Sequence, residues 1–171
     1  MPAIPKSKRF APRAQTEVLW LDTVAALSTE GLPAPDVTEL AASTRLTREV
    51  NEVTGFSTKT NFAQTSDAGT FFMGKIPVSA EADDASIAFN ASRDGVDART
   101  LFEQGQTGYI VIAPSWEEGS LAEVYEAYVG SISLPRDLNA PQLIVVSFAT
   151  PSEPNQKFTI PVGVTLPTYG A

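Results

Sequence analysis

The stretch Ser86-Ile-Ala-Phe-Asn-Ala-Ser92 alternates between apolar residues and small or polar ones. Successive side chains of an extended strand point to opposite faces, so this stretch has one apolar face and one polar face. The apolar face holds Ile87, Phe89 and Ala91, and the polar face holds Ser86, Ala88, Asn90 and Ser92. A period of two is typical of a half-buried strand, so the stretch predicts a β-strand packed on a core.

The period changes directly after this strand. Asp94 and Gly95 are residue types that cap helix N-termini, and Gly105 suits the position just past a helix C-terminus. The residues between them carry an apolar stripe about one helical face wide. The sequence therefore predicts one α-helix over about residues 95–104.

Further β-rich segments lie on both sides of this strand and helix. They are residues 17–23, 70–77, 108–114, 123–133, 142–150 and 157–164. Residues 45–65 predict either strand or extended loop, with two possible strands broken near Thr54-Gly55. Asp36, with Glu39 at the capping-box position, predicts a short helical turn over residues 37–42. Six or more strands with one main helix predict a mainly β fold, a β-sandwich or barrel with one flanking α-helix and long loops.

Charge is distributed unevenly along the 171 residues. The net charge is −8, from 20 acidic and 12 basic residues. Residues 1–13 hold four cations and no acid, so the remainder carries a net charge of −12. We predict a flexible, basic, extended N-terminal arm over residues 1–16 and a single β-sandwich domain over residues 17–171. The arm either stays solvated or orders on an acidic neighbour, for which a second copy of this chain is the obvious candidate. The arm residues expected to make such contacts are Lys6, Lys8, Arg9, Phe10 and Arg13.

The chain contains no His and no Cys. This excludes zinc fingers, haem and iron–sulfur sites, Cys nucleophiles, Ser–His–Asp arrangements and disulfides, and it favours an intracellular folding compartment. The N-terminus lacks the apolar region of a signal peptide, and the longest apolar run, residues 143–149, is far shorter than the roughly 20 residues that span a bilayer. We expect no membrane association. The acidic body repels phosphate, so sequence-specific nucleic-acid binding by it is disfavoured.

Three sequence patterns could carry chemistry, and each has a simpler interpretation. Residues 69–76 have the Gly and Lys spacing of a phosphate-binding loop, but Ile76 stands where Mg²⁺ binding needs Ser or Thr, so a strand is favoured. The acidic clusters at 81–84 and 117–118 do not match EF-hand ligand spacing, so solvated loop acids are favoured. The aromatic residues form either a sugar-binding platform or core and subunit contacts, and the second is favoured. They are Trp20, Tyr109, Trp116, Tyr125 and Tyr128. We therefore predict no cofactor, no metal site and no enzymatic activity.

Several short segments follow one another in a characteristic order. They are Val18-Leu-Trp-Leu-Asp-Thr-Val24, residues 32–40 followed by Leu46-Thr47, Arg93-Asp94, Gly105-Gln-Thr-Gly-Tyr-Ile-Val-Ile112, Glu123-Val-Tyr125 with Gly130, and Phe158. Over residues 17–164 their order and spacing resemble the major tail tube proteins of long-tailed bacteriophages, particularly the group found in phages of actinobacteria. Residues 50–70 and the basic first 13 residues depart from that pattern.

The resemblance implies a subunit that closes into rings, typically hexamers, stacked into the hollow virion tail tube through which DNA leaves. It implies other copies of the chain as the main partner, tape-measure, tail-tip and tail-terminator proteins as further partners, DNA as non-specific passing cargo, and assembly in the host cytoplasm. Ser86, Asn90 and Ser92 are then candidates for a lumen or inter-subunit face, and residues 1–16 and 50–69 for ring stacking. The alternatives are another phage structural protein, such as a tail-completion or head-decoration protein, and a β-sandwich ligand-binding module.

Overall fold

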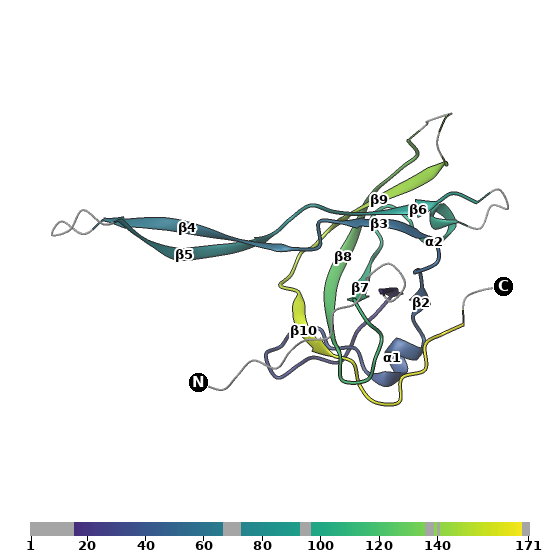
Figure 1. The fold of residues 1–171 in the computed structure, drawn as a ribbon, viewed down its shortest axis with the longest axis horizontal. Coiled ribbons are helices and arrows are strands. Elements are labelled where there is room, and N and C mark those ends of the chain that lie inside the picture. Colours follow the sequence, from purple (N-terminus) through teal and green to yellow (C-terminus); the bar gives the residue numbers. More distant parts are fainter. Residues whose placement is uncertain (1–15, 67–72, 93–96, 136–138, 140, 169–171) are drawn as a thin grey trace.

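The computed structural model describes residues 16–66, 73–92, 97–135, 139 and 141–168. Within these residues the chain forms ten strands and two short helices (Figure 1). The strands are β1 (Glu17–Leu21), β2 (Thr44–Arg45), β3 (Val50–Thr54), β4 (Thr58–Ser66), β5 (Met73–Ala82), β6 (Ala85–Asn90), β7 (Thr107–Ala113), β8 (Leu121–Ser133), β9 (Leu143–Ala149) and β10 (Asn155–Thr159). The helices are α1 (Val37–Ala41) and α2 (Ala98–Leu101). The prediction of a mainly β fold is confirmed.

Eight of the strands form one antiparallel sheet. Its order is β2-β1-β7-β8-β9-β6-β3, with β10 paired to β8 beside this path. Trp20 of β1 packs against Phe148 of β9, with ring centroids 6.3 Å apart, although two strands separate β1 from β9 in the sheet. The sheet must therefore curl over its own core. Its end strands β2 and β3 are also joined by only residues 46–49, so the fold is a partly open barrel.

The core lies on both faces of this curled sheet. On the inner face, the rings of Trp20, Phe102 and Phe148 meet at centroid distances of 5.0–6.3 Å. On the outer face of β1, β7 and β8, a second cluster includes Leu40 of α1 and Ile160, which follows β10. Because both of its faces are covered, the centre of β7 is apolar without alternation, as expected of a strand buried on both sides.

The helices differ in how well the sequence predicted them. The capping box at α1 is present as predicted, because Asp36 accepts from the Glu39 N–H and Glu39 accepts from the Asp36 N–H. The helix predicted over residues 95–104 is wrong in length, since α2 spans four residues and its N-cap is Asp97. The proposed caps Asp94 and Gly95 lie outside the described residues. The helix ends early because Phe102 turns into the core with an extended backbone.

Two strand boundaries also differ from the prediction. The segment 70–77 was expected to end at Pro77 and the acids at 81–84 to lie in a loop, yet β5 continues through Pro77 to Ala82 and includes Glu81. Proline is tolerated here because β5 pairs with β4 alone and the register shifts beside Pro77, where a ladder N–H is dispensable. The last strand ends at Thr159, short of the predicted 164. Residues 45–65, for which the sequence left strand and extended loop open, form the strands β3 and β4 on either side of Gly55.

Candidate functional site

A sheet face of small, polar side chains runs across β3, β6, β9 and the end of β8. Ser86 and Asn90 of β6 lie on it, half-exposed, as the sequence predicted for one side of this strand. Across the ladders Ser86 lies opposite Thr54 and Ser147, and Ala88 lies opposite Glu52 and Val145. We call this surface the polar face, and it consists of Glu52, Thr54, Ser86, Ala88, Asn90, Ser131, Ser133, Leu143, Val145, Ser147 and Ala149. Its largest apolar side chain, Leu143, lies opposite Asn90. Ser92, the third predicted residue, lies beyond the end of β6, and its backbone contacts Asp97.

The chemistry of the polar face is that of hydroxyls, an amide and methyl groups. The hydroxyls of Ser131 on β8 and Ser147 on β9 share a hydrogen bond of 2.8 Å. Some hydrogen-bonding groups of the polar face are therefore paired between neighbouring strands. A Cβ at Gly130 would lie 3.0 Å from the Ser147 hydroxyl, so the strands approach closely here. Glu52 contributes the one carboxylate of the face, and none of its residues is Lys or Arg. A phosphate group would find no cationic partner on it.

The hairpin formed by β4 and β5 projects away from the sheet (Figure 1). Register places Phe62 opposite Pro77, and the alternation of each strand puts Met73 and Ala80 on the same side. The same side also carries Thr60, Gln64 and Lys75, so it is mixed in character. We call its apolar residues, Phe62, Met73, Pro77 and Ala80, the hairpin apolar face. Phe62 and Met73 are 59% and 62% exposed, whereas the other side carries Lys59, Asn61, Ser79 and Glu81, together with Ala63 and Ile76. An isolated two-stranded hairpin is only marginally stable in water, and exposed apolar residues mark interaction sites. The hairpin is therefore a candidate surface for contact with another protein.

The base of the hairpin is fixed to the core. Phe56, just before β4, is buried against Tyr125 with ring centroids 5.2 Å apart. The Tyr125 hydroxyl lies 2.5 Å from the Phe56 carbonyl oxygen and 2.8 Å from Oε2 of Glu123. Burial, together with the Glu123 carboxylate, raises the pKa of Tyr125, so the hydroxyl keeps its proton and can donate. These contacts set the direction in which the hairpin leaves the body.

Gly55, the residue before Phe56, allows the two ends of the hairpin to approach each other closely. Gly55 has a φ of +90°, and a Cβ at this position would lie 2.1 Å from the Asp84 carbonyl oxygen and 2.6 Å from the Ala85 Cα. Only glycine fits both this backbone conformation and this approach. The two ends of the hairpin are thereby held together at its root.

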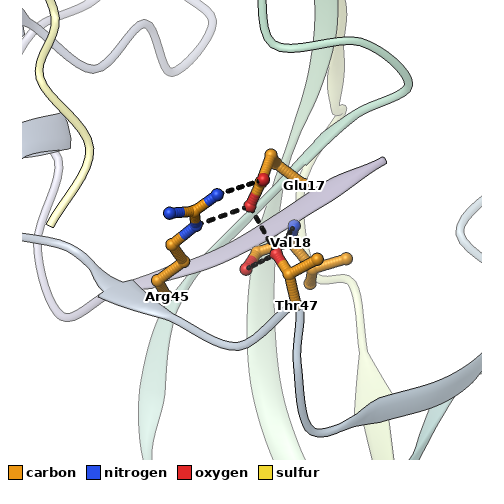
Figure 2. Close-up of polar contacts among 4 residues, drawn as sticks. All are labelled: Glu17, Val18, Arg45 and Thr47. Atoms are coloured by element: carbon orange, nitrogen blue, oxygen red, sulfur yellow. Dashed lines mark hydrogen bonds and ion pairs between the residues drawn. The ribbon is translucent and has the colours of Figure 1, made fainter. Parts of the chain in front are cut away.

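A polar clasp lies at the start of β1 (Figure 2). The Glu17 carboxylate accepts hydrogen bonds from Nε of Arg45 at 2.7 Å and from the Thr47 hydroxyl at 2.6 Å, and it is also paired with Nη2 of Arg45. The Val18 N–H donates to the Thr47 hydroxyl at 3.0 Å. The clasp therefore ties β1 to the segment that follows β2. Burial would raise the pKa of Glu17, but the hydrogen bonds from Arg45 and Thr47 and the Arg45 charge outweigh it, so the pKa is lowered.

The clasp predicts a pH-dependent contribution to stability. Replacing Glu17 by Gln is expected to reduce the free energy of unfolding at pH 7 by about 1–3 kcal/mol, because a half-buried Arg45 loses its counter-charge. The folded-state pKa lies below the unfolded value of 4.5, so this contribution is present above that pH and is lost as pH falls through the folded pKa. Urea unfolding of both proteins between pH 7 and pH 3 measures it. A stability difference that stayed constant down to pH 3 would contradict this role.

Other predicted sites are placed as follows. The arm residues Lys6, Lys8, Arg9, Phe10 and Arg13 lie outside the described residues. Of residues 69–76, those that the structure describes belong to β5, in line with the strand interpretation. Trp20 and Tyr125 are core residues, and Tyr128 is 43% exposed. In the described ranges no three Asp or Glu side chains converge as metal ligands would, and no helix there is long and apolar enough to cross a membrane.

Two solved structures of known proteins have a fold similar to that of this chain. The sheath/tube terminator of the extracellular contractile injection system PVC, in its extended state, superposes with a TM-score of 0.59 at 10% identity, over 88% of this chain and 98% of that one. The tube-terminating cap of the anti-feeding prophage superposes with a TM-score of 0.53 at 13% identity, over 86% of this chain and 91% of that one. At such identities the likeness shows a shared fold. No curated protein sequence matches the chain.

The sequence itself carries the family relationship. A family model described as phage tail tube protein matches residues 1–163, which includes every strand described above. The match also covers the basic first 13 residues and residues 50–70, the two segments in which the sequence departs from the pattern set out above. The chain therefore belongs to the phage tail tube protein family, whose members are structural components of the virion tail.

Proposed function

We propose that copies of this chain close into rings, hexamers by the family resemblance, and that the rings stack into a hollow tube through which DNA leaves the virion. The observation that carries this proposal is the polar face, a four-strand surface of small side chains with one carboxylate and no cation. Such a surface suits a channel wall along which a polyanion slides without binding.

Ring closure is supported by the edges of the sheet. Among the described strands of this sheet, β3 pairs on one side only, with β6, and β10 pairs on one side only, with β8; the two-residue strand β2 likewise pairs only with β1. Unpaired edges are templates for pairing with another chain. Pairing between copies would join the polar faces of successive subunits into one continuous wall and leave no open edge.

Ring stacking is supported by the hairpin. Its apolar face exposes Phe62 and Met73 on an element that the contacts of Phe56 and Tyr125 hold in a fixed direction. A second copy is the occupant we propose for this face, because Phe62 and Met73 are large apolar side chains exposed on a projecting hairpin, and contact with another subunit would remove them from water. The hairpin extends the segment 50–69 that the sequence suggested for this role.

The channel proposal makes a prediction about DNA. Replacing Ser86 and Asn90 together by Lys is expected to give tubes that bind short duplex DNA at low salt, with affinity that falls steeply as salt rises, whereas wild-type tubes leave the DNA free. Lys at Thr29 and Gln104, two exposed residues outside the polar face and outside the edge strands, adds the same charge and is the control. Co-sedimentation of DNA with tubes measures the difference. Equal DNA binding by the two double variants would count against a channel position for the polar face.

Negative-stain electron microscopy of the purified protein tests the proposal as a whole. Hollow tubes or stacked rings are the expected result. Single closed rings or trimers would favour a tail-completion or head-decoration protein. Monomers under every condition, including addition of tail-tip and tape-measure proteins, would favour a ligand-binding module.

We also propose virion assembly in the host cytoplasm, with the tail-tip, tape-measure and tail-terminator proteins as partners, and the actinobacteriophage group as the subfamily.

A further inference from the structure

An acidic groove opens where β1 ends and β7 begins. Two adjoining pockets of about 250 Å³ each share Asp22 and Thr23 in their walls. The complete lining is Leu21, Asp22, Thr23, Val24, Thr38, Glu39, Ala42, Ser43, Thr107, Gly108, Tyr109 and Glu126. We call it the β1 groove. It holds three carboxylates and apolar side chains, and none of its lining residues is Lys or Arg.

The carboxylates of the β1 groove are held in place. Asp22 accepts from Nε1 of Trp20 at 2.9 Å. Glu39 accepts from the Ala25 N–H at 2.6 Å and from the Asp36 N–H at 2.9 Å. These donors are neutral, so the groove keeps its negative charge. Burial raises the pKa of Tyr109, and the charges of Glu126 and Glu39 raise it further, because nearby carboxylates disfavour a negatively charged tyrosinate.

One segment of the chain matches this groove in chemistry. Residues 1–13 carry Lys6, Lys8, Arg9 and Arg13 without any acid, and Phe10 stands among these cations. An aromatic side chain flanked by cations suits a groove with apolar walls, a half-buried tyrosine and three carboxylates. Phosphate-bearing ligands are excluded by the same charges.

The two ends of β1 set the distance between the start of the arm and the β1 groove. The arm joins the body at Glu17, the first residue of β1, and the β1 groove opens beyond Leu21, the last residue of that strand. The two features therefore lie at opposite ends of one strand, about 14 Å apart. Complementary surfaces at opposite ends generate an open, head-to-tail assembly. Fifteen extended residues reach up to about 50 Å, so the arm can reach either its own groove or that of a neighbouring copy. The neighbour is favoured by the proposed tube, because only that contact joins subunits.

We propose that residues 6–13 of one copy bind in the β1 groove of the next copy, with Phe10 against Tyr109 and the arm cations beside Asp22, Glu39 and Glu126. This proposal rests on the proposed function, because it names the contact that joins successive subunits along the tube. It assigns the acidic partner of the arm to a defined part of the surface.

A charge exchange tests the contact without disturbing the internal hydrogen bonds of the groove. Lys at Thr23 and Thr38, two exposed groove residues, is expected to reduce the fraction of protein in tubes by about tenfold or more, because it repels the arm. Glu at Lys8 and Arg9 is expected to do the same from the other side. Combining all four substitutions is expected to restore tubes, since the new charges again attract. Lys at Thr29 and Gln104, two exposed residues outside the groove and the edge strands, is the matched control and should assemble as wild type does.

The outcomes separate this inference from the proposed function. Tubes from wild type that persist in both double variants would overturn the arm contact and leave the tube itself standing. Absence of rings and tubes from wild type would instead overturn the proposed function. A second measurement uses the absence of native cysteines. Cys at Ala11 and Thr23 should yield covalent oligomers on oxidation, whereas an internally linked monomer would show that the arm folds back onto its own groove and would overturn the inference.

Discussion

Replacing Gly55 by valine is expected to be among the most damaging single substitutions in this chain, lowering the free energy of unfolding by more than about 3 kcal/mol. The φ of +90° excludes a β-branched residue, and the new Cβ would lie 2.1 Å from the Asp84 carbonyl oxygen. Backbone atoms on both sides of the contact belong to the root of the hairpin and cannot move independently. Urea unfolding followed by tryptophan fluorescence measures the loss.

Gly31 provides a matched control for the backbone conformation alone. Its φ is +78°, but no atom lies within 4 Å of a Cβ built on it. Alanine at Gly31 is therefore expected to cost only the strain of the left-handed region, about 1 kcal/mol. If Gly55→Val and Gly31→Ala were equally mild, the close approach of Gly55 to Asp84 would have no energetic importance.

Replacing Phe62 by aspartate is expected to abolish tube formation while leaving the fold intact. Phe62 is 59% exposed in the single chain, so the change removes little core packing. In the proposed stack it is buried against a second copy, where an unpaired carboxylate would be strongly destabilising. Electron microscopy scores assembly, and circular dichroism melting of the unassembled protein scores the fold.

Thr65→Asp is the control for this substitution. Thr65 is exposed on the same strand, but alternation places it on the side opposite to Phe62. The control should form tubes as wild type does. Normal tubes from Phe62→Asp would contradict the stacking role of the hairpin apolar face, and equal loss in both variants would show that any added charge on β4 is harmful.

Local patterns predicted most of the elements whose environment is simple. Ser86 and Asn90 lie on the half-exposed side of β6, as the alternation indicated, because β6 has the core on one side only. The capping box at Asp36 was also predicted correctly, since both of its hydrogen bonds form within four residues. Both features depend on residues that are close together in the sequence, so the sequence alone is enough to predict them.

Features that depend on distant contacts could not be predicted in the same way. The helix was expected to run to residue 104, but burial of Phe102 beside Trp20 ends α2 at Leu101. Likewise, the continuation of β5 through Pro77 depends on a register shift against β4, which is not visible in the local sequence. In each case a contact made elsewhere in the chain overrides the local preference.

The candidate surfaces were predicted only in part. Ser147 and Ser131 join Ser86 on the polar face because of the ladder order β6-β9-β8, and no local pattern indicates which strands become neighbours. The β1 groove likewise gathers Asp22, Glu39 and Glu126 from three separate segments. The excess of acid outside the first 13 residues was visible in the sequence, whereas its concentration in one groove required the fold.

Helical reconstruction of assembled tubes at side-chain resolution tests the central claim most directly. The account predicts that Ser86, Asn90 and Ser147 line the channel, that β3 pairs with a neighbouring subunit, and that Phe62 is buried against a subunit of the adjacent ring. A tube whose polar face lies on its outer surface, or whose channel is lined by Lys and Arg side chains, would contradict it.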